Sequence, residues 1–230
     1  MNKHFLYGLI FFVFLSSCSK LSHPFVYDPG LSKYNHNGYT LLFEDKSGAF
    51  APGLKKQFVE TFFEVYPKLA KVFNANTARQ VVFKIDPDYK GVAATSEDIV
   101  RFDPVWFQKN PKDIDVVTHE VMHIVQNYRN SIGPWWLTEG IADYARDVYG
   151  VSNANANWRL NLPGANDQYD KGYRVTARFL LWIEKKVKSG FVKYINSALR
   201  EHTYSDDMWQ QYTGKTKETL WSDYIANPDI

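Results

Sequence analysis

A pair of histidines four residues apart, His119 and His123, constrains this chain more than any other feature of its sequence. The apolar residues around them recur at intervals of three and four between Ile114 and Tyr128, which predicts an α-helix. At about 100° per residue, both histidines point away from most of that apolar face. Two imidazoles one turn apart can reach the same metal ion, with Glu120 projecting beside it. The stretch therefore predicts a packed helix with one metal-binding face.

The alternative is a chance His-Glu-x-x-His pattern on a solvent-exposed helix. Val116 and Met122 lie near the histidine side of the predicted helix. A helix that is apolar on most sides is buried on most sides. A buried His-Glu-His triplet needs partners, which favours a metal site over a solvated face.

The rest of the chain predicts strands mainly before this helix and helices after it, which is an α+β arrangement in one domain. Asn110 is expected to cap the helix that carries the histidines, with Pro111 as its first residue. The predicted strands are 39–43 and 80–85, with a hairpin or an edge strand at 92–102; the predicted helices are 53–74, 110–128, 138–149, 172–188, 191–200 and 217–226.

A third metal ligand is expected downstream, because a catalytic zinc site usually has three protein ligands and an open position. Glu139 begins a predicted helix, and Gly140 after it allows close approach of another group. Asp143 lies one turn further on the same face, where it could accept the free ring N–H of a liganding histidine. The alternatives are a glutamate that favours the helix dipole and a solvated surface aspartate.

The segments HEVMHIVQ and PWWLTEGIADYAR resemble the plant basic secretory protein family, a group of zincin-like proteins with bacterial members. The resemblance continues through GYRVTARFLLWI and YTGKTKETLWSDY and covers the chain from about Tyr39. WLTEGIADY is also similar, more distantly, to a stretch of gluzincin peptidases whose glutamate is the third zinc ligand, which implies this role for Glu139. The resemblance implies a compact zincin-like fold with a small mixed sheet over the active-site helix.

The chain departs from two related groups of peptidases. Metzincins have a glycine and a third histidine shortly after the motif, where this chain has Gln126 and Arg129, so a three-histidine site is not expected. Gluzincin aminopeptidases have a G-x-M-E-N segment that captures a free amino terminus, and this chain has VAATSEDIV at the comparable edge. We therefore expect a zinc-dependent endopeptidase.

In such an enzyme Glu120 is expected to be the catalytic base, taking a proton from a water held by zinc. Tyr173 is the candidate donor to the oxyanion, with Tyr169 in reserve, and simple packing at a helix start is the alternative. The expected substrate is a protein or peptide, glycopeptides included. Two other functions stay open: a surface protein that binds glycans or peptides without turnover, and a zinc hydrolase of non-peptide bonds.

The segment 151–171 is polar and shows no clear periodicity. Loops of this length in a compact domain are usually functional or disordered. We expect a lid or a specificity loop over the cleft.

The first residues predict export to a membrane. The apolar run Phe5–Leu15 is too short to span a bilayer as a helix and is typical of a secretory signal. Leu15-Ser16-Ser17-Cys18 resembles the lipobox of bacterial lipoproteins, which implies lipidation of Cys18; a chance cysteine in an uncleaved signal is the alternative. The expected segments are a signal peptide (1–17), a tether (18–38) and a metallopeptidase domain (39–230).

Composition limits the remaining partners. Cys18 is the only cysteine, so the folded part has neither a disulfide nor a cysteine metal site. With 27 basic and 25 acidic residues and no basic arm, the chain is not expected to bind nucleic acid. We expect a monomer that a lipid anchor holds at the membrane, in the periplasm or on the cell surface.

Overall fold

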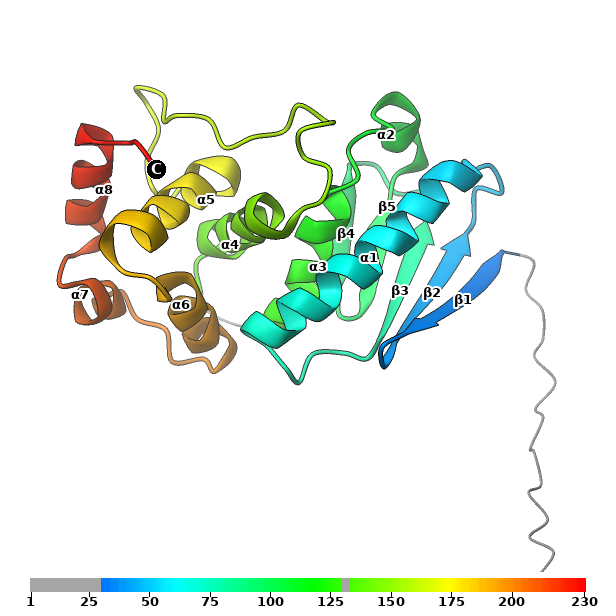
Figure 1. Cartoon of the computed structure of the whole chain (residues 1–230), viewed down its shortest axis with the longest axis horizontal. Coiled ribbons are helices and arrows are strands. Elements are labelled where there is room, and N and C mark those ends of the chain that lie inside the picture. The colour runs from blue at the N-terminus through cyan, green and yellow to red at the C-terminus, as the bar shows by residue number, and fades with distance from the viewer. Residues whose placement is uncertain (1–29, 130–132) are drawn as a thin grey trace, which may run out of the picture.

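A mixed sheet and a group of helices lie side by side in the structure, a computed structural model that describes residues 30–129 and 133–230 (Figure 1). The strands of the described residues are β1 (Leu31–His36), β2 (Tyr39–Asp45), β3 (Gln80–Ile85), β4 (Ala93–Ser96) and β5 (Ile99–Phe102). Their order is β1-β2-β3-β5-β4. The three central strands are parallel, and β1 and β4 are antiparallel at the two edges. The architecture is α+β with a small mixed sheet, as expected.

The helices connect the sheet to a helical half of the domain. α1 crosses the sheet, α3 packs against both α1 and α4, and α4 packs closely on α5 (Figure 1). The sequence predicts neither α2 nor α7. The helices of the described residues are α1 (Pro52–Phe73), α2 (Pro104–Lys109), α3 (Val116–Gln126), α4 (Trp135–Tyr149), α5 (Tyr173–Trp182), the π-helical turn η1 (Ile183–Val187), α6 (Phe191–Arg200), α7 (Asp207–Thr213) and α8 (Lys217–Ala226).

One face of the sheet supplies much of the apolar core. Alternate residues of β2, β3 and β5 are buried, while their neighbours on the other face are less so. Phe58 and Phe62 of α1 pack edge-on against Phe102 and Phe83, with ring centroids 5.0 and 5.5 Å apart. A sheet that buries only one face needs this alternation. Aromatic pairs thus help to pack α1 onto the sheet.

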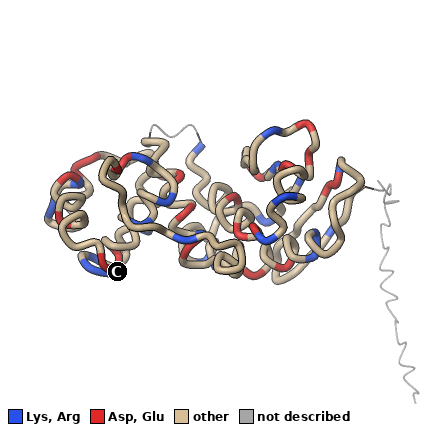
Figure 2. The backbone as a smooth tube through the Cα atoms, turned by 90° about the horizontal axis from the view of Figure 1, so that it is seen from above, with Lys and Arg blue, Asp and Glu red and all other residues tan. Residues whose placement is uncertain are grey.

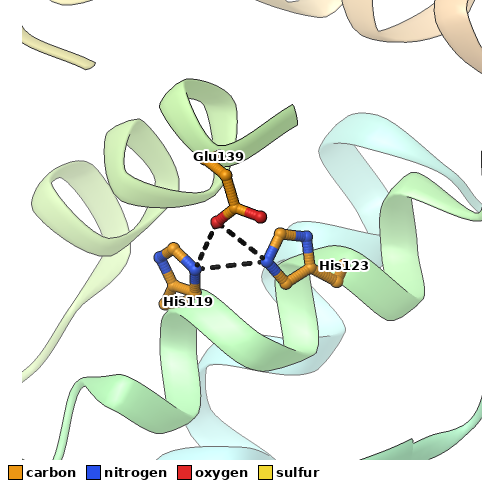
Figure 3. Close-up of side chains that lie close together, drawn as sticks. All are labelled: His119, His123 and Glu139. Carbon is orange, nitrogen blue, oxygen red and sulfur yellow. Dashed lines mark hydrogen bonds and ion pairs between the residues drawn. The ribbon is translucent and has the colours of Figure 1, made fainter. Parts of the chain in front are cut away.

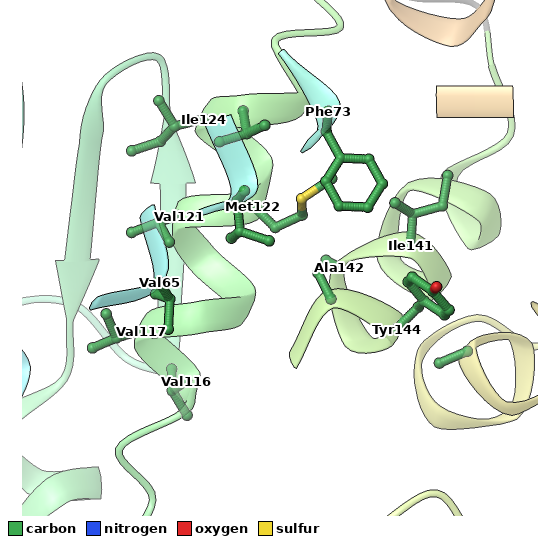
Figure 4. Close-up of a cluster of buried hydrophobic side chains, with 14 of the residues drawn as sticks. Val65, Phe73, Val116, Val117, Val121, Met122, Ile124, Ile141, Ala142 and Tyr144 are labelled. Atoms are coloured by element: carbon green, nitrogen blue, oxygen red, sulfur yellow. The ribbon is translucent and has the colours of Figure 1, made fainter. Parts of the chain in front are cut away.

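The helix that carries the histidines is buried on nearly every side. Figure 4 shows Val117 and Val121 on the side of α1, near Val65, with Met122 directed toward α4. Of the eleven residues of α3, only His123 is half-buried and all others are buried. The polar side chains of α3 must therefore find partners inside the protein.

The start of this helix differs from the prediction. α3 begins at Val116, and Asn110 ends α2 instead of capping α3, so Pro111 lies in a turn. A cap of the predicted kind occurs seven residues earlier, at the start of α2. There Asp103 accepts a hydrogen bond from the backbone N–H of Val105, and Pro104 is the first residue of the helix. Both sites carry a polar residue before proline, and the local signal does not distinguish them.

Part of the predicted tether (18–38) is a strand. Leu31–His36 form β1, which pairs with β2 along its whole length. The connecting turn is Asn37-Gly38, and both residues have positive φ, 48° and 79°. An Asn-Gly turn of this kind matches the twist of a hairpin, so the sequence did contain the signal for a strand before residue 38.

The predicted signal peptide and Cys18 lie outside the described residues. In the part of the chain that the structure describes, no helix combines the length and apolar character that crossing a membrane requires. Basic and acidic residues are interspersed along the described backbone (Figure 2).

Gly140 is required where α4 meets α5. A Cβ at this position would lie 2.3 Å from Cγ2 of Thr176. Thr176 cannot easily move, because its hydroxyl donates to the carbonyl of Tyr169 and accepts from the backbone N–H of Gly172. The close approach expected at Gly140 is therefore made by a buried side chain of α5.

We predict that Gly140→Ala lowers the free energy of unfolding by roughly 1 to 2 kcal/mol, because overpacking against Thr176, about 2 to 3 kcal/mol, exceeds a helix-propensity gain of about 1 kcal/mol. The melting temperature should fall by about 2 to 8 °C. Gly53→Ala is the matched control, since a Cβ there meets no atom within 4 Å. Equal melting temperatures for the two variants would contradict the packing argument.

Candidate metal centre

Three side chains from two helices converge at one point (Figure 3). His119 and His123 come from consecutive turns of α3, and Glu139 comes from the first turns of α4. The two Nε2 atoms are 3.1 Å apart, and Oε2 of Glu139 lies 3.2 Å from Nε2 of His119 and 3.6 Å from Nε2 of His123. The structure thus brings together all three residues predicted as metal ligands.

The outer ring nitrogens of both histidines already have partners. Nδ1 of His119 lies 2.7 Å from a carboxylate oxygen of Asp143, and Nδ1 of His123 lies 2.7 Å from Oε1 of Gln126. Since both partner oxygens can only accept hydrogen bonds, each Nδ1 carries a proton, and each Nε2 is left to offer its lone pair to a metal ion. Asp143 therefore occupies the position that the sequence predicts for it.

Lone pairs of two imidazoles and a carboxylate oxygen cannot face one another at this distance without a cation or a proton between them. Donor atoms about 2.0 to 2.2 Å from a tetrahedral zinc ion lie roughly 3.3 Å from each other. The observed separations of 3.1, 3.2 and 3.6 Å match this value. Nitrogen and carboxylate donors, two of them oriented by outer hydrogen bonds, are a set that suits zinc.

The charges of the triad support the same conclusion. Burial lowers the pKa of His119, but its hydrogen bonds to Asp143 and Glu139 raise it more, to about 10 in the metal-free protein. Burial raises the pKa of Glu139, but the two histidines hold it well below its usual range. The metal-free triad therefore retains a proton that a metal ion must displace, and binding becomes tighter as pH rises.

Glu120 lies beside the triad without joining it. Its side chain is 6% exposed, and Oε2 accepts a 2.7 Å hydrogen bond from the hydroxyl of Thr95. Thr95 belongs to the edge strand β4, which lies along α3. The sequence carries no local signal for this contact, because the two residues are 25 positions apart.

Gln126 is the second partner that the sequence reasoning missed. Besides accepting from His123, its amide donates to the carbonyl of Thr138, 2.8 Å away, and so links the end of α3 to the beginning of α4. Its spacing of three residues from His123 on the same helix face was an available signal. The residue that departs from the metzincin pattern thus has a clear structural role here.

The structure separates the two candidate tyrosines. The ring of Tyr173 stacks on His119, with centroids 6.2 Å apart and planes 15° apart, and it lines the cavity above the triad. Burial and the charge of Glu139 both raise the pKa of Tyr173, so its hydroxyl remains a hydrogen-bond donor at neutral pH. Tyr169 packs between Trp136 and Trp221, and it is absent from the cavity lining. Of these two candidates, only Tyr173 lines the site.

Tyr173 also has an unusual backbone. It begins α5 with a φ of 47°, directly after Gly172 with a φ of 79°. A non-glycine residue in this region costs of order 1 to 3 kcal/mol and persists only where the surroundings enforce it. The backbone of Tyr173 is therefore strained in the conformation in which its ring stacks on His119.

The site opens into a cavity of about 1020 Å³. Its walls include β4, α3, α4, the first turn of α5, and two residues of the segment 151–171, Trp158 and Lys171. The segment is anchored where it starts, because the buried carboxylate of Asp115 accepts the backbone N–H groups of Val151 and Ser152. The polar loop of the sequence thus contributes to the cavity wall; closure over the site stays a prediction.

We predict that Asp143→Asn weakens zinc binding by about 10 to 100-fold, the usual effect of losing an outer carboxylate. The amide keeps the size of the side chain but removes the charge that faces Nδ1 of His119. Competition with a chromophoric chelator measures the affinity. Asp147→Asn, one turn further along α4 and outside the cavity lining, is the control and should leave the affinity unchanged. Equal affinities for both variants would rule out the role of Asp143.

Comparison with known proteins agrees with this geometry. The model of a family described as peptidase of plants and bacteria matches residues 39–224. A comparison with curated proteins found no match. Similar solved structures include an M1 zinc metallopeptidase from Deinococcus radiodurans, with 12% sequence identity, a TM-score of 0.51, and coverage of 87% of this chain and 51% of that chain.

A variant of that enzyme bound to a Tyr-Ser-Ala substrate gives similar values, with 14% identity, a TM-score of 0.51, and coverage of 87% of this chain and 52% of that chain. At such identities the likeness concerns the fold alone. The chain spans about half the length of the structures it matches. The family match covers both helices that carry the triad and agrees with the resemblance seen in the sequence. The chain belongs to the family of peptidases of plants and bacteria.

Proposed function

We propose that this protein is a zinc-dependent endopeptidase. The observation that carries the proposal is that three possible metal ligands converge in the wall of an open cavity. Glu120, which is not one of these ligands, lines the same cavity beside them. His119, His123 and Glu139 would hold the zinc ion. When bound, zinc supplies a Lewis acid that polarises a carbonyl group and makes a nearby water more acidic.

The remaining chemistry belongs to residues of the chain. Glu120 takes the proton of the attacking water and passes it to the leaving amine, and the hydroxyl of Thr95 fixes one of its oxygens. Tyr173 donates a hydrogen bond to the oxyanion that forms as the carbonyl is attacked. Asp143 and Gln126 keep the two histidines in the correct tautomer.

Peptides are favoured as substrates by the family match and by the tripeptide seen in a structural neighbour. The presence of Glu120 beside the triad favours turnover over binding alone. Endopeptidase action is supported by the segment VAATSEDIV, which stands where gluzincin aminopeptidases have the G-x-M-E-N segment that captures a free amino terminus.

Zinc analysis combined with proteolysis tests this proposal. Purified protein without residues 1–18 should contain about one zinc per chain and cleave an unfolded protein at internal bonds, as mass spectrometry of the products would show. A chelator should stop the cleavage, and added zinc should restore it. Zinc binding without cleavage of any protein or peptide would favour the binding function, and products shortened only from one end would exclude an endopeptidase.

We also propose that the protein is a lipoprotein anchored through Cys18, with the domain exported to the periplasm or the cell surface. The support is the apolar run followed by Leu15-Ser16-Ser17-Cys18. Basic and acidic residues are interspersed along the described backbone (Figure 2) and nearly balance in number, which does not favour nucleic acid as a partner, and we propose a monomer.

Replacing Cys18 with serine should release the protein from the membrane fraction or block processing of the signal. Fractionation and mass spectrometry of the amino-terminal peptide measure this. Ser17→Ala leaves the cysteine in place and is the control. An unlipidated wild-type protein that stays in the membrane fraction would contradict the proposal.

A further inference from the structure

Arg174, the second residue of α5, carries a charge that the site as described does not use. We infer that its guanidinium binds a carboxylate of the peptide substrate and so determines specificity. This inference rests on the proposed function, since it concerns the same cavity. Arg174 lines that cavity and directly follows Tyr173, which stacks on His119. The arginine is therefore close to where a bound peptide would be cleaved.

The other charged side chains of the cavity wall all have partners. Lys171 pairs with Asp167 at 2.5 Å, and Arg146 pairs with Asp113 at 2.5 Å. The acidic residues are bonded to histidines, to an arginine or to Thr95. Among the residues that the structure describes, Arg174 makes neither an ion pair nor a hydrogen bond, and its side chain is exposed to the cavity. One uncompensated positive charge thus faces the substrate space.

Trp158 holds this charge in place. Its indole is 7% exposed, and the guanidinium of Arg174 lies 5.0 Å from the ring centroid. The same ring is contacted by Arg146, whose guanidinium is 4.3 Å from the centroid and already neutralised by Asp113. A guanidinium stacked on an aromatic ring keeps its N–H groups free at the edges. Trp158 therefore orients Arg174 without using its hydrogen-bond donors.

A carboxylate is the group that such an arginine selects. A planar guanidinium can donate two parallel hydrogen bonds to it, and the pair gains strength in a partly enclosed cavity. The carboxylate could be an acidic side chain near the scissile bond or the carboxyl terminus of the peptide. Because Arg174 is exposed, we expect a preference of roughly 5 to 30-fold over an uncharged analogue.

Peptides with matched charges test the inference. The starting point is a peptide that the zinc-loaded protein cleaves, with its amino terminus acetylated and its carboxyl terminus amidated. At each position around the scissile bond, one peptide carries glutamate and a matched peptide carries glutamine. The wild type should show a kcat/KM ratio of Glu to Gln of roughly 5 to 30 at one position. A second set with free and amidated carboxyl termini separates the terminal carboxylate from a side chain. In Arg174→Gln the ratio should fall to about 1, and Arg174→Glu should prefer lysine there.

Arg159→Gln is the matched control, because Arg159 is also exposed and follows Trp158 but lies outside the cavity wall. It should keep the wild-type ratio. Calorimetry of the same peptides with the zinc-loaded Glu120→Gln protein measures the preference without turnover. The inference is overturned if the peptides are cleaved or bound without any carboxylate preference, or if neither peptide binds. The proposed function still stands in any of these cases where cleavage is seen. A binding preference without cleavage by the wild type supports the inference and overturns the proposed function.

Discussion

Glu120→Gln should lower the turnover of an unfolded protein substrate by about 10² to 10⁴-fold, the usual contribution of a positioned general base. The amide has the size of the carboxylate and can still accept the hydrogen bond from Thr95, but it cannot take a proton from water at neutral pH. Zinc content should not change, because Glu120 is not one of the three converging donors. Single-turnover cleavage and elemental analysis of the same preparation measure both quantities.

A suitable control for this experiment is Glu97→Gln. Glu97 lies in the turn between β4 and β5, is exposed, and does not line the cavity. Its replacement should leave both turnover and zinc content unchanged. If Glu120→Gln cleaved as fast as the wild type, the activity would come from another site or from a contaminant. If Glu120→Gln lost its zinc, the glutamate would be a ligand and not a base.

His123→Asn should weaken zinc binding by about 100 to 1000-fold. A zinc site with four protein ligands contributes about 10 to 16 kcal/mol, so the loss of one ligand costs on the order of 3 kcal/mol. The effect should exceed that of Asp143→Asn, because His123 supplies a donor atom and Asp143 only orients one. The variant should also lose the rise in melting temperature that saturating zinc gives the wild type.

The control for this variant is His202→Asn. His202 is exposed and outside the cavity, and asparagine tolerates its positive φ of 58°. This variant should bind zinc like the wild type. Zinc affinity that does not depend on His123, measured by chelator competition at constant pH, would exclude the proposed ligand set.

Several features of the fold follow from local sequence patterns alone. Local sequence patterns predict α1, α6 and α8 within one or two residues, and they predict β3 at its observed bounds. The hairpin of β4 and β5 follows from the polar turn between two apolar runs. These elements form from contacts between near neighbours in the chain, so their signals are contained in short windows.

Other elements depend on contacts that no short window contains. The start of α3 at Val116 is stabilised by Asp115, whose carboxylate binds Thr118 and the backbone of residues 151 and 152. The sequence offered Asn110-Pro111 as the start of this helix, and these hydrogen bonds of Asp115 favour the later start that the structure shows. The Asn-Gly turn before β2, in contrast, was a local signal that could have been used.

The sequence by itself determined that His119 and His123 share one helix face with Glu120 beside them, because a helix repeats every 3.6 residues or so and the spacing fixes their directions. Glu139 was the candidate third ligand from its place in the next predicted helix, and the resemblance to known peptidases supported this role. Only the tertiary structure decided that α4 lies with its first turns over α3, which brings Glu139 within 3.2 Å of His119. The same packing selected Tyr173 over Tyr169 and supplied Thr95 from the sheet edge. These contacts join residues 20 to 54 positions apart, and their geometry is set by how the core packs, which no local pattern encodes.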